Sequence, residues 1–236
     1  HRYRRGADVW HSIVAHPEPT EDRMMMVVER QIGGVTRRFL EVTETENRSI
    51  PKRDQHRLQC VIVYEDTEID EDATETVITG LGHLEGAAVI AFADGRSHQG
   101  TVVSGSITVP WRAERVYVGL EAEAPYLSPI LAYASGGGTA LTQPRKVHTL
   151  GISVKDTPPG ILLVGDGLTD MVALEDRLDG EGGTLTMDDE QQTMTGIAMV
   201  GISSSWSLNA KFAIKATLAG PATIVFIVPH MEGGNR

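Results

Sequence analysis

Short runs rich in Val, Ile and Thr recur along the whole chain, and turn residues interrupt them at intervals of about ten residues. Paired turn residues that favour the positive φ of tight hairpins stand at Gly33–Gly34 and Asp94–Gly95. No stretch of about 12 residues has the periodicity of an amphipathic helix. The pattern predicts an all-β fold of several small antiparallel β-sandwich or barrel modules, which could include part of a β-propeller.

The expected strands follow the apolar runs, and proline and glycine mark the connections between them. Pro125 and Pro129 predict a loop around Tyr126, because proline cannot donate a ladder hydrogen bond. Residues 171–178 fit either a short helix or, as we favour, an exposed loop, and residues 136–138 predict a flexible tip. The expected strands are residues 24–30, 36–43, 58–64, 76–79, 87–93, 100–103, 107–109, 116–120, 147–154, 161–164, 194–202, 212–218 and 224–228.

The chain has 236 residues, enough for one large domain or two small ones. We expect residues 1–57 to form a β-hairpin region, part of a propeller or platform that begins upstream. Residues 58–112 are expected to form a small β-barrel module. Residues 113–236 are expected to form a C-terminal sandwich-like region with an acidic loop at 165–196. Because the chain begins at His1 inside an arginine-rich stretch, we expect it to be part of a longer polypeptide.

The whole chain has a formal net charge of −11, and its negative charge is concentrated after residue 57. Residues 1–57 hold 11 basic and 9 acidic side chains, and the remainder holds 10 basic and 23 acidic ones. Residues 65–75 contain seven acids, and residues 156–190 contain ten acids and one base. Tight DNA binding needs Lys and Arg to displace phosphate counterions. We therefore expect no specific DNA binding and no attraction to anionic membranes, although DNA could pass such a surface without being held.

The longest apolar run and the cysteine content exclude two further classes of protein. The run at residues 87–93 has seven residues, far fewer than the roughly 20 that a membrane-spanning helix needs. The single cysteine, Cys60, excludes an internal disulfide and a cysteine-rich zinc site. Assembly in a reducing cytoplasm fits this composition.

Candidate metal-binding patterns are incomplete. Asp66, Glu68, Asp70 and Asp72 alternate like calcium ligands, but the loop positions that require Gly and Glu hold Glu71 and Val77. A solvated linker is the favoured interpretation, and the same holds for the loop acids Asp166 and Asp170. No cofactor and no metal ligand are therefore expected.

Candidate catalytic patterns are also incomplete. Glu85 stands where the third glycine of a dinucleotide fingerprint belongs. His83 and Glu85 could form a metal or acid–base pair; the favoured interpretation is that the ring caps a turn and the carboxylate accepts backbone N–H bonds. Ser203, Ser204 and Ser205 fit a turn or an edge. We expect no enzyme and no catalytic residue, and we expect three tryptophans to be core or interface anchors: Trp10, Trp111 and Trp206.

Three consecutive segments carry a resemblance to a known family: Val77-Ile-Thr-Gly-Leu-Gly-His-Leu-Glu-Gly86, Val89-Ile-Ala-Phe-Ala-Asp-Gly95 and Thr101-Val-Val-Ser-Gly-Ser-Ile-Thr-Val109. Together they resemble a module of tail tubular protein B, the tail nozzle family of short-tailed bacteriophages. Flanking segments agree in the same order, so the resemblance covers most of residues 9–234. Residues 165–196 have no counterpart in the family pattern, and much of the family's large N-terminal portion is missing. The flanking segments are residues 9–12, 26–30, 33–34, 38–41, 116–120, 126 and 220–234.

The resemblance implies a structural role in a virion tail. Nozzle subunits form rings of six copies around the channel through which the genome leaves, so the implied partners are other copies, a tail adaptor or gatekeeper protein, tail fibres and transiently passing double-stranded DNA. Assembly would take place in the host bacterial cytoplasm. The alternative is a receptor- or glycan-binding β-module of a phage tail, with or without hydrolase activity, which would need an aromatic-lined cleft and paired carboxylates.

Two surfaces follow from this implied role as hypotheses. A surplus of negative charge suits a conduit for a polyanion, because a basic lining would hold the DNA by its phosphates. We therefore expect the acidic loops to face the lumen. The basic residues of the N-terminal region are a candidate surface for neighbouring subunits or fibres. The alternative is that they are solvent-exposed charges that bind no partner. These residues are Arg37, Arg38, Arg48, Lys52 and Arg53.

Overall fold

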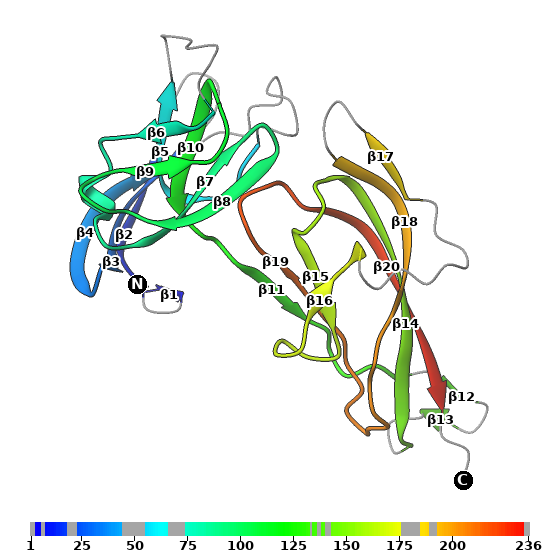
Figure 1. Cartoon of the computed structure of the whole chain (residues 1–236). Coiled ribbons are helices and arrows are strands. Elements are labelled where there is room, and N and C mark those ends of the chain that lie inside the picture. Colours follow the sequence, from blue (N-terminus) through cyan, green and yellow to red (C-terminus); the bar gives the residue numbers. More distant parts are fainter. Residues whose placement is uncertain are drawn as a thin grey trace. The chain divides into compact units, whose positions relative to one another are not determined.

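The computed structural model describes residues 3–5, 8–17, 23–43, 55–65, 74–132, 134–135, 138–139, 143–175, 185–188 and 193–233. These residues form β-strands that pair only antiparallel, so the expected all-β fold is confirmed (Figure 1). Helical conformation among the described residues is of the 3-10 type, as in the three-residue turn η2 (Gly82–Leu84). No helix among the described residues has the length and hydropathy that crossing a membrane requires.

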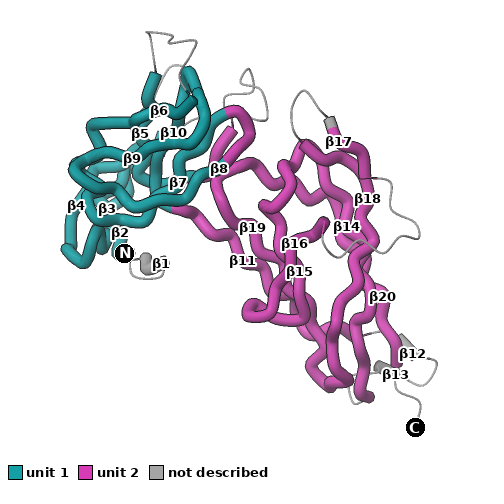
Figure 2. Tube along the Cα trace, viewed as in Figure 1, with its two compact units in different colours: residues 1–51, 58–93, 97–120 teal, residues 52–57, 94–96, 121–236 magenta. Residues whose placement is uncertain are grey.

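The chain divides into two compact units (Figure 2). Unit 1 comprises residues 1–51, 58–93 and 97–120, and unit 2 comprises residues 52–57, 94–96 and 121–236. The division into three modules at residues 57 and 112 stays a prediction.

Unit 1 contains two four-stranded sheets and a two-stranded ribbon. The first sheet is a meander in the order β1-β2-β3-β4, and the second has the order β5-β10-β7-β8. The strands of the first sheet are β1 (Tyr3–Arg5), β2 (Asp8–His16), β3 (Arg23–Ile32) and β4 (Val35–Val42). Those of the second are β5 (Gln59–Glu65), β7 (Ala88–Ala93), β8 (Arg96–Thr101) and β10 (Arg115–Leu120), and the ribbon joins β6 (Thr76–Ile78) to β9 (Ile107–Val109).

One hydrophobic core lies between the ribbon and the second sheet of unit 1. Side chains from β6 and β9 pack with alternate residues of β7 and β10, and Leu81 and Leu84 of the η2 turn are fully buried among them. The β3–β4 hairpin joins the same core through Ile32 beside its turn and Phe39 within β4. The inner face of the meander is thereby fixed to the rest of unit 1.

Unit 2 encloses its core between two further four-stranded sheets. The shorter sheet has the order β11-β19-β15-β16, and the longer one, hereafter the long sheet, has the order β17-β18-β14-β20. The shorter sheet comprises β11 (Ala124–Leu127), β15 (Leu162–Gly165), β16 (Val172–Ala173) and β19 (Ala213–Ala216). The long sheet comprises β14 (Arg145–Thr157), β17 (Thr186–Asp188), β18 (Thr193–Gly201) and β20 (Thr223–Gly233), and β12 (Ala134–Ser135) pairs with β13 (Gly138–Thr139).

The core of unit 2 follows the alternation of its strands. Leu150, Ile152 and Val154 of β14 point to one side of the long sheet and meet Leu162 and Val164 of β15 from the opposite sheet. Because successive side chains of a strand alternate between faces, the intervening residues of β14 lie on the outer face. That outer face forms part of the candidate site below.

The sheets of both units stay open. The edges of the second sheet in unit 1 are β5 and β8, and these two strands do not pair with each other. Among the described residues, neither the closed barrel nor the propeller that we considered as alternatives is found.

Turn chemistry predicted both hairpins correctly. Gly33 and Gly34 have φ values of 56° and 81° between β3 and β4, and Asp94 and Gly95 have values of 52° and 74° between β7 and β8. These are the positive φ values that two-residue hairpins need.

The predicted loop around Tyr126 is wrong. Residues 124–127 form strand β11, which pairs with β19 at the edge of the shorter sheet. Pro125 is tolerated there because an edge strand does not need every backbone donor. Residues 171–175 contain no α-helix, and β16 pairs there with β15.

Candidate functional site

The segment that carries the family resemblance forms a structural turn. Both oxygens of Glu85 accept backbone hydrogen bonds, one from the N–H of Ser104 at 2.9 Å and one from the N–H of Gly105 at 2.6 Å. The prediction that this carboxylate accepts backbone N–H bonds is confirmed. The His83 ring packs edge-on against Phe39 with ring centroids 6.3 Å apart, so it covers the hairpin rather than capping a turn.

The same segment anchors the β3–β4 hairpin. Arg37 Nη1 donates to the carbonyl oxygens of Gly82 and His83, both at 3.1 Å. A Cβ atom added to Gly33 would lie 2.7 Å from the carbonyl oxygen of Glu85. The hairpin therefore approaches the turn so closely that only glycine fits at this position, and Arg37 serves a contact within unit 1.

A buried polar cluster joins the meander to β5. The guanidinium of Arg30 donates through Nε and Nη2 to the two oxygens of Glu41, both at 2.7 Å, and through Nη1 to Gln59 at 2.8 Å. The S–H of Cys60 donates to Glu41 Oε1 at 3.0 Å. Arg30 is 3% exposed, so its charge depends on this carboxylate for compensation.

The cluster shifts two pKa values in ways that suit a structural role. Burial, helped by the hydrogen bond to Glu41 and the charge of that carboxylate, raises the pKa of the Cys60 thiol to about 12. Burial also acts to raise the pKa of Glu41, but the hydrogen bonds from Arg30 and Cys60 and the charge of Arg30 outweigh it and hold the pKa below its usual value. A protonated thiol beside an ionised, paired carboxylate is a poor nucleophile.

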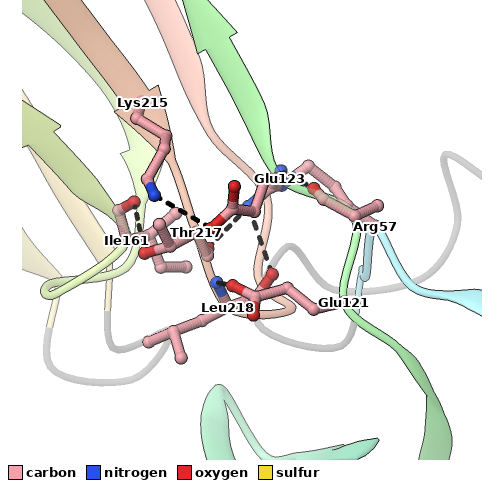
Figure 3. A network of polar contacts seen from close by, with 8 residues as sticks. Arg57, Glu121, Glu123, Ile161, Lys215, Thr217 and Leu218 are labelled. Carbon is pink, nitrogen blue, oxygen red and sulfur yellow. Dashed lines mark hydrogen bonds and ion pairs between the residues drawn. The ribbon is translucent and has the colours of Figure 1, made fainter. Parts of the chain in front are cut away.

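A second polar network, within unit 2, surrounds Arg57 (Figure 3). The Arg57 guanidinium donates to the carbonyl oxygens of Gly220 at 2.8 Å, Ala122 at 3.1 Å and Thr217 at 2.7 Å. Its backbone N–H donates to the carbonyl oxygen of Ala219 at 2.7 Å. These contacts hold together three segments that are far apart in sequence: Arg57, Ala122 and residues 217–220. The role of Arg57 that they indicate is structural.

The remaining candidates do not gather into a reactive site within the described residues. Asp66, Glu68, Asp70 and Asp72 lie outside the described residues. Asp166 and Asp170 lie exposed in the loop after β15. No three His, Cys, Asp or Glu side chains of the described part lie close enough together to hold a metal ion. Ser203–205 follow β18 as non-strand residues, and the N–H of Ser204 donates to the carbonyl oxygen of Ile202 at 3.0 Å, as in the turn that we expected as one of two alternatives. Ser204 Oγ donates to the carbonyl oxygen of Val147 in β14 at 2.6 Å.

The tryptophans divide between core and surface. Trp111 packs partly buried against the core of unit 1, which confirms its expected role as a core anchor. Trp206 is half exposed, and Trp10 lies partly buried in β2.

The meander exposes an apolar outer face, which we call the meander face. Direct pairing places Val14, Met25 and Val42 side by side across β2, β3 and β4, and Val27 and Leu40 form the next row. Val14, Leu40 and Val42 are 62%, 67% and 47% exposed. A sheet normally places polar residues on the side that faces water, so this face departs from the usual alternation.

One end of the meander face is polar. Arg38 Nε donates to Glu29 Oε2 at 3.0 Å, and His11 Nε2 lies 3.2 Å from the same oxygen. These hydrogen bonds, that of Arg38 first, hold the pKa of Glu29 below its usual value. Arg38, predicted to belong to an interaction surface, is exposed at this end, whereas Arg48, Lys52 and Arg53 lie outside the described residues.

The long sheet exposes a second apolar outer face, the long-sheet face. Gly151 of the central strand β14 pairs with Met199 and Val228, and Ser153 pairs with Ile197 and Phe226. A Cβ atom on Gly151 would lie 3.4 Å from the Met199 sulfur and 3.7 Å from Val228 Cβ, which places both side chains on the Gly151 face. Phe226 and Val228 are 44% and 48% exposed.

Sequence reasoning did not find either face. It identified the strands, but an apolar run predicts burial without specifying which side of the sheet another layer covers. No protein-family model matches the chain, and no curated protein matches it.

Proposed function

We propose that this chain is a structural component of a bacteriophage tail, a nozzle or tube subunit that assembles with copies of itself into a ring around the channel for genome ejection. The observation that carries the proposal is the pair of apolar outer faces, one in each unit. Monomeric proteins seldom expose extended apolar patches, and those that do commonly use them for association.

The sequence resemblance supplies the kind of assembly. Its most specific residues, around Glu85 and Gly86, are engaged in contacts that hold the turn and the hairpin together. Such residues stabilise the fold of the module, which agrees with a structural subunit in the wall of a ring. A tail adaptor or gatekeeper protein and tail fibres are the further proposed partners, and the virion tail is the proposed location.

The charge of the chain suits a channel for DNA. Each copy carries a formal net charge of −11, so a ring of six would carry about −66, which repels the phosphate backbone. Acidic residues that face the lumen would let DNA slide past without a binding step. Much of both acidic stretches lies outside the described residues, and their lumenal placement is part of the proposal.

Electron microscopy of the purified full chain tests the proposal. Negative-stain images over a range of protein concentrations should contain six-fold ring views and tapered side views. A matched assay with host surface polysaccharide covers the alternative function. Binding or cleavage of the polysaccharide by a chain that shows no rings would favour the receptor- or glycan-binding module instead.

A further inference from the structure

We propose that His148 and His230, near one end of the long sheet, form a two-histidine site for a divalent transition-metal ion that prefers imidazole ligands, such as Cu²⁺ or Ni²⁺. The two rings come from the neighbouring strands β14 and β20, and their centroids lie 6.1 Å apart. Histidines this far apart in the sequence show no ligand spacing, so sequence reasoning expected no metal ligand among them. The site would belong to the single chain, whether or not copies assemble into a ring.

A β-bulge brings the two rings together. The register between β14 and β20 shifts between Val147 and Thr149, so His148 is an extra residue in β14, and His230 pairs with Thr149. Val147 and Leu150 are fully buried in the core of unit 2, whereas His230 is exposed. Thr149 and His230 therefore lie on the outer face of the long sheet, and the bulge lets the ring of His148 reach His230. Bulges re-aim side chains in this way and are frequent beside functional sites.

A hydrogen bond orients the His148 ring. Its Nδ1 lies 2.9 Å from Thr149 Oγ1. When the ring proton is on Nδ1, the N–H donates to this hydroxyl, and the lone pair of Nε2 stays available for an ion. Histidines that bind metals commonly donate their other ring N–H to an oxygen, which fixes the tautomer and the direction of the ring.

The separation of the rings is close to that of two imidazoles on one ion. An imidazole nitrogen binds such ions at about 2.0–2.1 Å, which puts the centroids of two rings on neighbouring coordination positions about 4.5–5 Å apart. The observed separation of 6.1 Å is about 1 Å larger, a gap that rotation about the side-chain torsions can close. Such rotation is available because His230 is exposed and His148 is only partly buried.

The two ligands also select the ion. Imidazole suits Cu²⁺, Ni²⁺ and Zn²⁺, with Cu²⁺ bound most tightly, whereas Mg²⁺ and Ca²⁺ prefer oxygen ligands. Since no three His, Cys, Asp or Glu side chains of the described residues gather at one point, water or an added chelator would fill the other coordination positions. An ion held in this way would link the edge strand β20 to β14 beside the bulge, where the ladder is interrupted.

Titration of the untagged full chain with Cu²⁺ held by iminodiacetate tests the site. This chelate leaves neighbouring coordination positions open, so it binds two adjacent imidazoles in preference to a single one. His148→Ala and His230→Ala each remove one ligand. His98→Ala is the matched control, because it removes a histidine of unit 1 whose ring packs against Trp111. Circular dichroism of each variant verifies folding, and H230A should fold because the side chain is exposed.

We expect the wild type and H98A to bind one equivalent of the chelate, with two imidazole nitrogens in the pulsed electron paramagnetic resonance spectrum. Either H148A or H230A should weaken this binding by about 100-fold, because the second ligand no longer contributes its effective concentration. At a free chelate concentration of about 100 times its Kd, the ratio of folded to unfolded wild-type chain in urea should rise about 100-fold, and that of H230A should change little.

Other results would overturn the inference. Equal affinities of the wild type and H230A would show that the ion binds elsewhere. A spectrum with a single imidazole nitrogen, or a loss of only half of the bound copper in each variant, would show that the two histidines bind independently. All of these results would leave the proposed ring function unaffected.

Discussion

At the scale of single residues, the choice of amino acid is constrained where two segments of backbone lie very close together. At Cys60 the β5 strand has a φ of 54°, and the register between β5 and β10 shifts at this point. The bulge presses Gln59 against the facing strand at Gly119, where a Cβ atom would lie 2.6 Å from the carbonyl oxygen of Gln59. A bulge of this kind fixes which residue faces which neighbour.

Replacing Gly119 with alanine should therefore destabilise unit 1. The new methyl group would meet a backbone atom that cannot move without breaking the β5–β10 pairing, and we expect a loss of about 2–4 kcal/mol in the free energy of unfolding. Urea denaturation followed by circular dichroism measures it. Gly82→Ala is the matched control, because an added Cβ there meets nothing within 4 Å, and it should change stability little. Equal effects of the two substitutions would contradict the account.

The buried thiol of Cys60 gives a second prediction at this scale. With its pKa raised from 9.0 to about 12, the thiolate fraction at pH 8 is about 1,000-fold lower than for an unperturbed thiol. Alkylation by iodoacetamide at pH 8 should accordingly be slower by this order in the folded protein than in urea. Rapid labelling of the folded chain would show that Cys60 is not buried beside Glu41 as described.

At the scale of elements, the contacts between sheets matter more than the strands themselves. The meander is joined to the rest of unit 1 by the apolar contacts of its β3–β4 hairpin and by two hydrogen bonds to β5, from Arg30 to Gln59 and from Cys60 to Glu41. The ion pair between Arg30 and Glu41 holds both of these side chains in place. An exposed ion pair such as Arg115 with Glu65 contributes little by comparison, because water screens it.

Glu41→Gln should weaken this joint in a pH-dependent way. The folded pKa of Glu41 lies below its unfolded value of 4.5, so its contribution is present above about pH 4.5 and is lost as the pH falls through the folded pKa. We expect the variant to be about 2–3 kcal/mol less stable at pH 7 and its stability to fall less steeply below pH 4.5. Urea midpoints between pH 3 and 7 measure this, with Glu65→Gln as the control. Parallel pH profiles for the wild type and E41Q would refute the assignment.

The sequence predicted the elements better than their packing. The hairpins at Gly33–Gly34 and Asp94–Gly95 could be predicted because turn residues act locally. Strand β11 was missed because the effect of Pro125 depends on whether the strand lies at an edge. The bulge at Cys60 has no local signal, since it arises from pairing with β10. Burial patterns likewise depend on which layers meet, so the exposure of Leu40 and Phe226 could not be predicted from their apolar strands.

At the scale of the whole molecule, the chain has features that suit the ring-forming subunit that we propose. Polar residues hold segments of the chain together in three places: at the turn around Glu85, around Arg30 and around Arg57. Exposed apolar side chains include those on the outer faces of two sheets, such as Leu40 and Phe226, and the surplus charge is negative. Each of these features suits association between copies and weak interaction with DNA.

The most direct test of this account is the mass of the particles that the full chain forms in solution. Native mass spectrometry over a wide concentration range should find a discrete species at six times the mass of one chain, which grows at the expense of the monomer as concentration rises. A chain that shows the monomer mass alone over the whole range would contradict the central claim that its sheets form a ring.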